Sequence, residues 1–334
     1  MKCVKVPLKE LNDTRIKLME EGLMNMEYRI KACDEFGYIP INEDVDGYEI
    51  ADVELEVMKK VPHNFAELLK DDLTSQEIEN LRTSFDTIGD VVILEIPDDL
   101  QDKKQKIGDA ALEFTKRKAI YMKKSAIKGT TRIRDLEFLS GVDDSVTIHK
   151  EHGARLKLDV REVYFSPRLA TERKRVMESV GDGERILDMF CGIGPFPIVI
   201  AKNKKVEITA VDINEAAIKY LNENIELNKL KGSIKTYCGD VREVSKSFNL
   251  KFDRIIMNLP GLAYTFLDVA VDLIEDDGII NYYEFSDSYE QGIKRLSDAC
   301  AQAGCEVEII NTRKVKSTSP GEWHVAIDGK IKKE

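Results

Sequence analysis

The second half of the chain alternates short apolar runs with longer amphipathic stretches. The apolar runs at 186–187, 206–211, 234–237 and 252–257 each end in polar residues, and a fifth run covers 279–283. Short buried runs separated by helix-length segments are typical of a parallel sheet covered by helices on both faces. Residues 307–314 and 323–327 alternate as a closing antiparallel hairpin should. The sequence therefore predicts an α/β fold with a Rossmann-like, seven-stranded, mostly parallel sheet over residues 151–334.

The first 150 residues carry shorter versions of the same pattern. Strand-like runs at 3–6 and 53–57 and a helix-capping segment at 12–14 predict a small α/β module over residues 1–60. A strong apolar run at 91–96, followed by a helical pattern from about 99 to 116, predicts a second α/β module over residues 61–150. The first module carries no cluster of catalytic residue types, so we expect it to be a docking or binding module.

The first strand of the large domain ends in Asp188, followed by a Gly-x-Gly turn at Gly192 and Gly194. Glycines allow a sharp turn and a close approach of the backbone to a ligand. The third glycine of a dinucleotide fingerprint is replaced by Pro197, which weakens the case for a pyrophosphate ligand but suits a first helical turn. Taken alone, a Gly-x-Gly turn is weak evidence, because turns use glycine for many structural reasons.

Polar residues at the ends of the next strands make the turn more specific. Asp212 ends the second strand, where a carboxylate can accept both ribose hydroxyls of a nucleoside cofactor. Asp240 ends the third strand and could face an adenine amino group, and Asn258 follows the fourth. Unrelated loops would explain any one of these residues but not the ordered set. This order is similar to that of S-adenosylmethionine-dependent methyltransferases.

The net charge of −11 argues against indiscriminate nucleic-acid binding, but the charge is unevenly distributed. One stretch contains eight basic residues and no acidic one: Lys116, Arg117, Lys118, Lys123, Lys124, Lys128, Arg132 and Arg134. Such a stretch is the pattern expected where phosphates bind. A solvated helix face followed by a basic loop explains the charges equally well.

The six cysteines are scattered without a Cys-x-x-Cys pair, which indicates neither a zinc ribbon nor a disulfide framework and favours a reducing cytoplasm. His149 and His152 have a metal-like spacing, but they sit beside Gly153 in a predicted hairpin turn, so we expect a surface loop and no metal site. No apolar run is long enough to span a bilayer, and no opening segment resembles a signal peptide.

Several segments together resemble the archaeal and eukaryotic tRNA (guanine-37-N1)-methyltransferases. The most specific are Phe-Ser-Pro-Arg-Leu at 165–169 and the upstream Arg-x-Arg within Thr-Arg-Ile-Arg-Asp at 131–135. They are accompanied by Phe-Asp-Thr-Ile-Gly-Asp at 85–90 and by the cofactor motifs at 188–196, 211–214, 240–244 and 257–260. The resemblance covers essentially the whole chain. It implies that S-adenosyl-L-methionine is the cofactor, that tRNA is the partner, that the two smaller modules bind RNA, and that a monomer suffices.

The resemblance also implies catalytic roles. Glu172 would be the general base for the guanine N1 proton, and Arg132 would stabilise the charge that develops at the guanine carbonyl. Asn258 would orient the target base, although Leu259 and Gly261 depart from the Asn-Pro-Pro-aromatic motif. From the residues alone, Glu172 could be an ordinary helix residue, Arg132 a phosphate contact and Asn258 a turn residue.

The remaining expected site residues form two groups. The cofactor group is Asp188, Phe190, Gly192, Gly194, Asp212, Ile213, Asp240, Val241 and Asn258. The RNA group is Lys123, Lys124, Lys128, Arg134, Tyr164 and Arg168, of which Tyr164 could equally be a core aromatic.

Two alternative functions remain at this point. Aminocarboxypropyltransferases of wybutosine-type tRNA modification use the same cofactor, but Asn258-Leu259-Pro260 favours methyl transfer. A catalytically silent tRNA-binding protein would have no need of Glu172, Arg132 and Asn258. A small-molecule methyltransferase would need neither small module.

Overall fold

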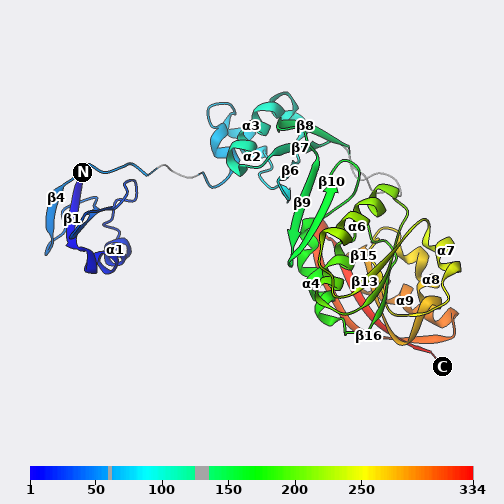
Figure 1. Cartoon of the computed structure of the whole chain (residues 1–334). Coiled ribbons are helices and arrows are strands. Elements are labelled where there is room, and N and C mark those ends of the chain that lie inside the picture. Colours follow the sequence, from blue (N-terminus) through cyan, green and yellow to red (C-terminus); the bar gives the residue numbers. More distant parts are fainter. Residues whose placement is uncertain (59–61, 125–134, 334) are drawn as a thin grey trace. The chain divides into compact units, whose positions relative to one another are not determined.

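The computed structural model describes residues 1–58, 62–124 and 135–333, and the chain divides into two compact units, Met1–His63 and Asn64–Glu334 (Figure 1). The first unit contains an antiparallel sheet of four strands in the order β2-β3-β1-β4. Its strands are β1 (Lys2–Pro7), β2 (Lys31–Ala32), β3 (Phe36–Pro40) and β4 (Glu49–Asp52), and helix α1 (Leu11–Glu20) packs on them. Val4, Leu18 and Ile39 form its buried centre.

The strand expected at 53–57 is shorter in the structure and starts earlier, as β4. Within 53–57, Val57 forms an isolated bridge with Tyr28, and Val53 and Glu56 make single backbone hydrogen bonds to Met1 and Arg29. Residues 49–52 pair instead with β1, in a register that places Lys2 opposite Asp52. Alternation of apolar and acidic residues was therefore a poor guide to the strand boundary here.

The second unit begins with a four-stranded sheet in the order β5-β6-β7-β8. Strand β6 (Val91–Leu94) lies parallel to β7 (Ala119–Lys123), and helix α3 (Lys104–Thr115) makes the crossover between them. Strands β5 (Asp86–Ile88) and β8 (Leu136–Gly141) pair antiparallel at the two edges. Short helices η2 (Phe65–Leu69), α2 (Ser75–Asn80) and η3 (Asp98–Lys103) complete this part.

Helix α3 ends at Lys116, whose backbone adopts a left-handed conformation with φ of 53°. That conformation turns the chain directly into β7. Hairpin β9 (Val146–Glu151) and β10 (Ala154–Asp159) follows β8. The expected module boundary at 150 falls inside this hairpin, so both of its strands belong to one element.

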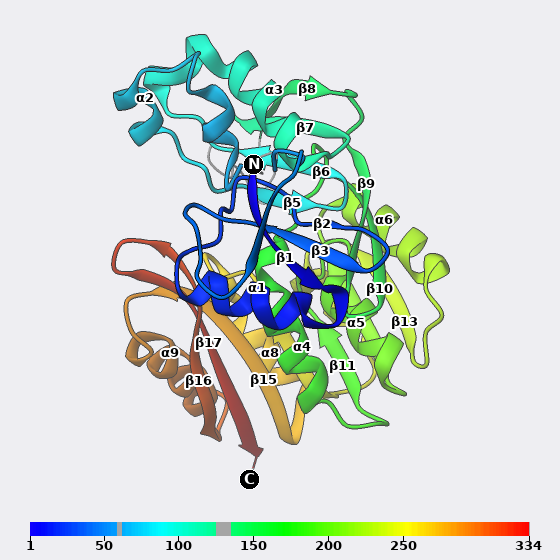
Figure 2. The same ribbon diagram turned by 90° about the vertical axis from the view of Figure 1, so that its left-hand side faces the viewer.

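The large sheet has seven strands in the order β13-β12-β11-β14-β15-β17-β16. Strands β11 (Arg185–Asp188), β12 (Glu207–Asp212), β13 (Ser233–Cys238), β14 (Phe252–Met257) and β15 (Ile274–Ser286) are parallel. The long hairpin β16 (Cys305–Ser319) and β17 (Glu322–Lys333) closes the sheet, with β17 antiparallel to both neighbours. Figure 2 shows this hairpin beside β15. The predicted Rossmann-like fold class is confirmed.

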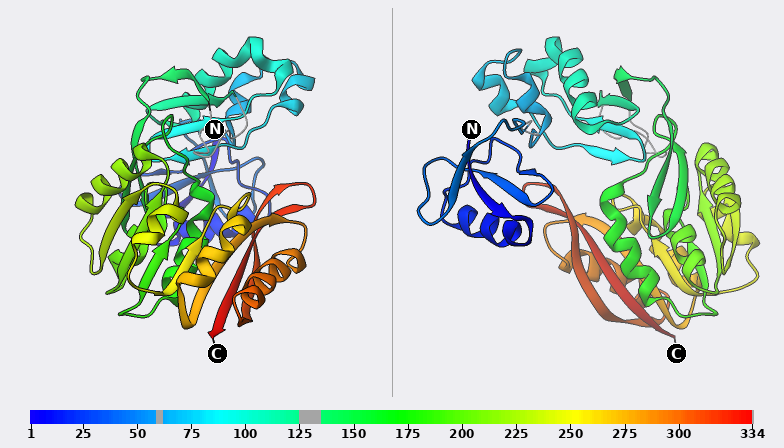
Figure 3. Two further views of the ribbon diagram at one scale, coloured as in Figure 1. Left: turned by 90° about the vertical axis from the view of Figure 1, so that its right-hand side faces the viewer. Right: turned by 60° about the vertical axis from the view of Figure 1, so that its left-hand side comes forward.

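Helices cover both faces of the large sheet, because successive buried residues of its strands point to opposite faces. In β14, Ile256 packs with α4 (Ala170–Ser179) and α5 (Pro195–Asn203), while Ile255 and Met257 pack with α8 (Leu267–Leu273) and α9 (Glu290–Gln302). Helix α6 (Glu215–Leu227) covers the outer strands next to β10, and short α7 (Val241–Val244) follows β13. Figure 3 shows the sheet between its helical layers.

The order of strands reverses between β11 and β14, because the chain moves outward from β11 to β13 and then returns. In doubly wound sheets, ligands bind beyond the carboxyl ends of the strands at such a reversal. The turns that follow β11, β12, β13 and β14 all lie at this edge. The fold therefore directs the search for a site to the polar residues at these strand ends.

Candidate active site

A cavity of about 360 Å³ lies at the carboxyl edge of the large sheet. Residues from the turns after four parallel strands line it, together with the segment that precedes α4. Those from the expected cofactor group are Phe190, Gly192, Asp212, Ile213, Asp240, Val241 and Asn258. The strand-end residues that are far apart in sequence thus meet at one cavity.

Asp212 is the most constrained polar group of this cavity. Its Oδ2 atom accepts a hydrogen bond of 2.7 Å from the backbone N–H of Gly192, and its Oδ1 accepts one of 2.9 Å from Asn214. Burial raises the pKa of the Asp212 carboxyl, and the backbone donors act in the opposite direction. A carboxylate has about four lone-pair sites, so acceptor capacity remains for a ligand hydroxyl.

The two glycines of the turn have different surroundings. A Cβ at Gly192, where φ is 54°, would meet only the backbone oxygen of Tyr164, at 4.0 Å. A Cβ at Gly194, where φ is 81°, would lie 2.2 Å from a methyl carbon of Leu221 on α6. Gly194 is absent from the cavity lining, so it serves helix packing, whereas Gly192 borders the open space.

Asp188 also does not line the cavity, contrary to its expected cofactor contact. It is 1% exposed, and its Oδ1 accepts a hydrogen bond of 3.2 Å from the backbone N–H of Phe190. Burial, with a smaller contribution from the nearby charge of Asp212, raises the pKa of its carboxyl to about 8, although the N–H of Phe190 acts in the opposite direction. Asp188 therefore supports the turn after β11 through its hydrogen bond with the backbone of Phe190.

Aromatic and apolar side chains form one wall of the cavity. The rings of Phe190 and Phe266 meet edge to face with centroids 5.0 Å apart, and the guanidinium of Arg242 lies 3.9 Å from the Phe266 centroid. At the same wall Asp240 caps α7 by accepting a hydrogen bond of 2.9 Å from the N–H of Arg242. A flat heterocycle with an exocyclic amine fits between an apolar wall and a carboxylate of this kind.

Asn258 follows β14 and lines the cavity. Its side-chain Oδ1 is buried and has no hydrogen-bond partner among the described residues. A buried carbonyl oxygen without a partner costs free energy unless a ligand donates to it. This atom is thus available to an N–H donor of a bound molecule.

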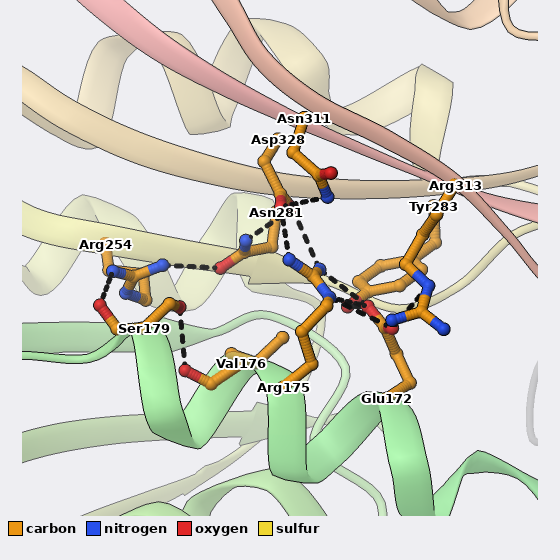
Figure 4. Close-up of polar contacts among 10 residues, drawn as sticks. All are labelled: Glu172, Arg175, Val176, Ser179, Arg254, Asn281, Tyr283, Asn311, Arg313 and Asp328. Atoms are coloured by element: carbon orange, nitrogen blue, oxygen red, sulfur yellow. Dashed lines mark hydrogen bonds and ion pairs between the residues drawn. The ribbon is translucent and has the colours of Figure 1, made fainter.

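Glu172 lies on α4 and does not line either of the two cavities described here. Its side chain is 1% exposed. Oε1 accepts hydrogen bonds of 2.7 Å from Arg175 Nη2 and 2.7 Å from the hydroxyl of Tyr283. Figure 4 shows the carboxylate turned toward these two partners. The expected base is therefore ionically paired in this structure, and Leu169 and Arg173 of the same segment reach the cavity instead.

A second cavity of about 470 Å³ lies between the β5–β8 sheet and the segment before α4. Both expected RNA contacts near that segment line it: Tyr164 borders both cavities, and Arg168 borders the second. Arg168 Nε donates a hydrogen bond of 2.6 Å to Asp86 Oδ1. Since the two cavities share Tyr164, Phe165 and Ser166 in their walls, they adjoin.

The basic stretch is not acid-free in space. Lys118 pairs with Asp144 at 3.0 Å, Lys123 with Glu95 at 3.6 Å and Lys124 with Glu137 at 3.6 Å. Strand pairing brings these carboxylates beside β7 from the end of β6, from β8 and from the loop after β8, so much of the charge seen along the sequence is balanced. Arg132, Lys128 and Arg134 lie outside the described residues.

Three further lining residues come from the last three strands. Phe285 of β15 and Lys316 of β16 border both cavities, and His324 of β17 borders the first. These strands were expected only as structural elements of the closing sheet. No motif marks the three residues, because they reach the site through the long-range pairing of β15 with β17 and of β17 with β16.

The described residues contain no cluster of three or more His, Cys, Asp or Glu side chains that could hold a metal ion. Within the same residues, no helix is long and apolar enough to cross a membrane.

Family models match most of the chain. A model described as the TRM5/TYW2 methyltransferase domain matches residues 147–309. The TYW2 N-terminal domain matches residues 65–145, and the tRNA methyltransferase 5 N-terminal domain matches residues 3–49.

Individual relatives match over the full length. The chain is 43% identical over 334 residues to tRNA (guanine(37)-N(1))-methyltransferase Trm5b of Pyrococcus abyssi, which covers 98% of both chains. A solved structure, the complex of aTrm5 and tRNALeu, superposes with a TM-score of 0.83 at 38% identity and covers 99% of both chains.

A relative with a different activity covers less of the chain. The tRNA(Phe) (4-demethylwyosine(37)-C(7)) aminocarboxypropyltransferase of Pyrococcus horikoshii is 32% identical over 268 residues, which are 79% of this chain and 95% of the relative. The part of this chain that the relative does not cover is about as long as the first unit. That unit is matched by the model of the tRNA methyltransferase 5 N-terminal domain.

Proposed function

The chain belongs to the TRM5/TYW2 family of tRNA-modifying enzymes, and from this premise we propose that it is the tRNA (guanine-37-N1)-methyltransferase of that family. The observation that carries this function is full-length similarity to an enzyme of that name, first unit included, combined with a nucleoside-sized cavity at the strand reversal. The transferred group goes to N1 of the guanosine on the 3′ side of the anticodon.

The cofactor of this family is S-adenosyl-L-methionine, and the cavity residues fit it. Asp212 retains acceptor capacity for the ribose hydroxyls, and Asp240 beside Phe190 and Phe266 suits the adenine. The space next to Gly192 lets the cofactor approach the turn closely. When bound, this cofactor supplies an electrophilic methyl group.

The protein's own residues orient the guanine and remove its proton. Asn258 Oδ1, buried and without a partner among the described residues, accepts a hydrogen bond from an N–H of the guanine. Guanine N1 carries a proton at neutral pH, so a base must take it during attack, and Glu172 has this role. Arg132 balances the charge that reaches the guanine carbonyl oxygen.

For Glu172 to act, its side chain has to turn from Arg175 and Tyr283 toward the cavity. The neighbouring positions Leu169 and Arg173 already line the cavity, which supports a change of side-chain torsions at Glu172 as the movement required. Catalytic hydrogen bonds often form only in the substrate complex.

The second cavity supports RNA as the substrate. It adjoins the first through Tyr164 and carries Arg168 at its rim, so a nucleotide that enters the first cavity would leave its neighbours along the second. Tyr164 offers a ring for stacking and Arg168 a guanidinium for phosphate. In keeping with a role in docking tRNA, the first unit has its own core and sheet.

The proposal includes a monomer that acts in the cytoplasm. All six cysteines are free thiols, as is usual in a reducing compartment. Size-exclusion chromatography with light scattering, with and without tRNA, tests the monomer.

The decisive experiment is incubation of the protein with labelled S-adenosylmethionine and unmodified tRNA transcripts, followed by nucleoside analysis. We expect 1-methylguanosine, and a transcript with adenosine at position 37 serves as the control. An aminocarboxypropyl product would identify the alternative transferase, and tRNA binding without any product would identify a silent binding protein.

A further inference from the structure

The proposed base, Glu172, shares the guanidinium of Arg175 with a second buried carboxylate, Asp328. Arg175 donates to Glu172 through Nη2 at 2.7 Å and Nε at 3.1 Å. The same guanidinium donates to Asp328 on β17 through Nη1 at 2.5 Å and Nη2 at 3.2 Å. The side chains of Glu172 and Asp328 are 1% and 5% exposed. Neither carboxylate can therefore rely on water as its partner.

Asp328 is held independently of Glu172. Its Oδ1 accepts a hydrogen bond of 2.7 Å from Asn281 on β15, and its Oδ2 accepts one of 3.0 Å from Asn311 on β16. The side chain of Asn281 is held in turn by Arg254, at 3.1 Å. Figure 4 shows these side chains converging from three adjacent strands on Arg175. Asp328 and Arg175 thus form a pair that stays in place whatever Glu172 does.

The second carboxylate keeps Arg175 paired when Glu172 loses its negative charge. If Arg175 had Glu172 as its one partner, protonation or departure of Glu172 would leave a cation that is only 22% exposed without a counter-charge, which is destabilising. With Asp328 present, the cation remains paired. We propose that Arg175, anchored by Asp328, is a positioning residue that holds the Glu172 carboxylate in place at rest and lets it accept the guanine proton without leaving an unpaired charge.

The proposal rests on the proposed function, and its proton step balances. The N1–H bond of guanine breaks and its proton moves to a carboxylate oxygen of Glu172. The N1 electron pair forms the bond to the methyl carbon, and the carbon–sulfur bond breaks with its electron pair going to sulfur. The negative charge lost at Glu172 matches the positive charge lost at the sulfonium, and Arg175 stays balanced by Asp328.

Two further side chains contact the carboxylate of Glu172 and contribute to its charge environment. Tyr283 of β15 donates to Oε1, and Arg313 of β16 lies 3.5 Å from Oε2. The ring of Tyr283 packs edge to face on His324, with centroids 5.4 Å apart, so one ring separates Glu172 from a residue of the cavity wall. On α4 itself, Arg173 is already paired with Glu151.

The test is the pH dependence of single-turnover methyl transfer, on the full chain with saturating tRNA and cofactor. The rate should rise with pH through a limb that reports ionisation of Glu172, and Glu172→Gln should abolish this limb. Asp328→Asn removes a neighbouring negative charge, so the limb should move down by about 1 pH unit and the plateau rate should fall. Arg175→Gln removes the cation, so the limb should move up by about 1–3 pH units.

Tyr283→Phe provides a variant that keeps the ring packing. It removes one donor to the ionised form of Glu172, so its limb should also move up. Glu308→Gln is the matched control, because it neutralises an exposed carboxylate on β16 that pairs with Lys332 and does not touch this cluster. Its limb should coincide with that of the parent. Loss of packing alone would lower rates or affinities without moving a limb.

The outcomes separate the proposals. If Asp328→Asn and Arg175→Gln keep the parental limb while Glu172→Gln loses it, the positioning role of Arg175 is overturned and the proposed function stands. If Asp328→Asn does not fold, Arg175→Gln decides. If Glu172→Gln retains the limb, Glu172 is not the base and this inference fails with it. If the parent makes no 1-methylguanosine, the proposed function itself is wrong.

Discussion

The carboxylate of Asp212 and the backbone of Gly192 are joined by a hydrogen bond of 2.7 Å across the turn after β11. The contact ties the ends of β11 and β12 together at the strand reversal. It also fixes the orientation of the carboxylate, because the second oxygen is held by Asn214. The residue expected to bind the ribose is therefore already oriented before a ligand arrives.

Replacing Asp212 by alanine should weaken binding of S-adenosylmethionine. Two ribose hydroxyls would lose their acceptor, which corresponds to about 1.5–3 kcal/mol, or roughly 10–150-fold in Kd. Isothermal titration calorimetry measures the change, and a parallel unfolding curve controls for loss of the turn. An unaltered Kd would remove Asp212 from the cofactor site.

The two glycines of the turn should respond differently to alanine. Gly194→Ala forces a Cβ to within 2.2 Å of Leu221 at a φ of 81°, so it should lower the free energy of unfolding by about 2–4 kcal/mol. Gly192→Ala has space for its methyl group and is strained only by its φ of 54°, so it should lower the free energy of unfolding less and should also weaken cofactor binding. Each variant serves as the control for the other. Equal effects on stability would contradict the assignment of Gly194 to packing.

Asp188 should make the stability of the cofactor-free protein depend on pH. Its pKa of about 8 lies above the value of 3.8 for an unperturbed carboxyl. The contribution of protonated Asp188 to the free energy of unfolding is therefore complete below pH 3.8 and is lost as the pH rises toward 8. The free energy of unfolding should fall, relative to that of Asp188→Asn, by about 1.4 kcal/mol per pH unit between roughly pH 5 and 7.5.

Chemical denaturation at several pH values measures this difference. Asp268→Asn, which changes an exposed carboxylate on α8, is the control and should follow the parent. Parallel curves for the parent and Asp188→Asn would show that the buried carboxyl is ionised throughout the range.

Replacing Lys123, Lys124 and Lys128 together by alanine should weaken tRNA binding and flatten its dependence on salt. Each lost phosphate contact should reduce the slope of log K against log salt by about 1. Lys124 should contribute more than Lys123, because their side chains are 56% and 19% exposed and Lys123 lies between Asp86 and Glu95. Cofactor affinity is the internal control. A parental salt slope would make these lysines ordinary surface residues.

Glu172→Gln should separate chemistry from binding. Glutamine keeps the shape of the side chain but cannot accept the proton, so tRNA and cofactor affinities should hardly change. Single-turnover methyl transfer should fall by roughly 10²–10⁴-fold, which is usual for a positioned general base. Rates within a few-fold of the parent would leave Glu172 as a structural partner of Arg175 and require another route for the proton.

Local patterns in the sequence were sufficient for the large sheet and for most of the cofactor cavity. Strand ends, turns and caps depend on neighbouring residues, so the positions of Asp212, Asp240 and Asn258 at the carboxyl edge followed once the parallel order was expected. The same reasoning included Asp188 and Gly194 in the site, because spacing does not distinguish a residue that faces a ligand from one that supports the turn beneath it.

Tertiary structure decided what depends on contacts between distant segments. It brought Lys316 and His324 to the cavity through a hairpin that no motif marks, and it placed Glu95 and Glu137 beside lysines that stand in an acid-free stretch of sequence. It also joined Glu172 to Asp328 through one guanidinium, although 156 positions separate the two carboxylates in the chain (328 − 172). The physical reason is that hydrophobic periodicity determines which face of an element is buried, whereas burial of charge is determined by the partners that the assembled sheet supplies.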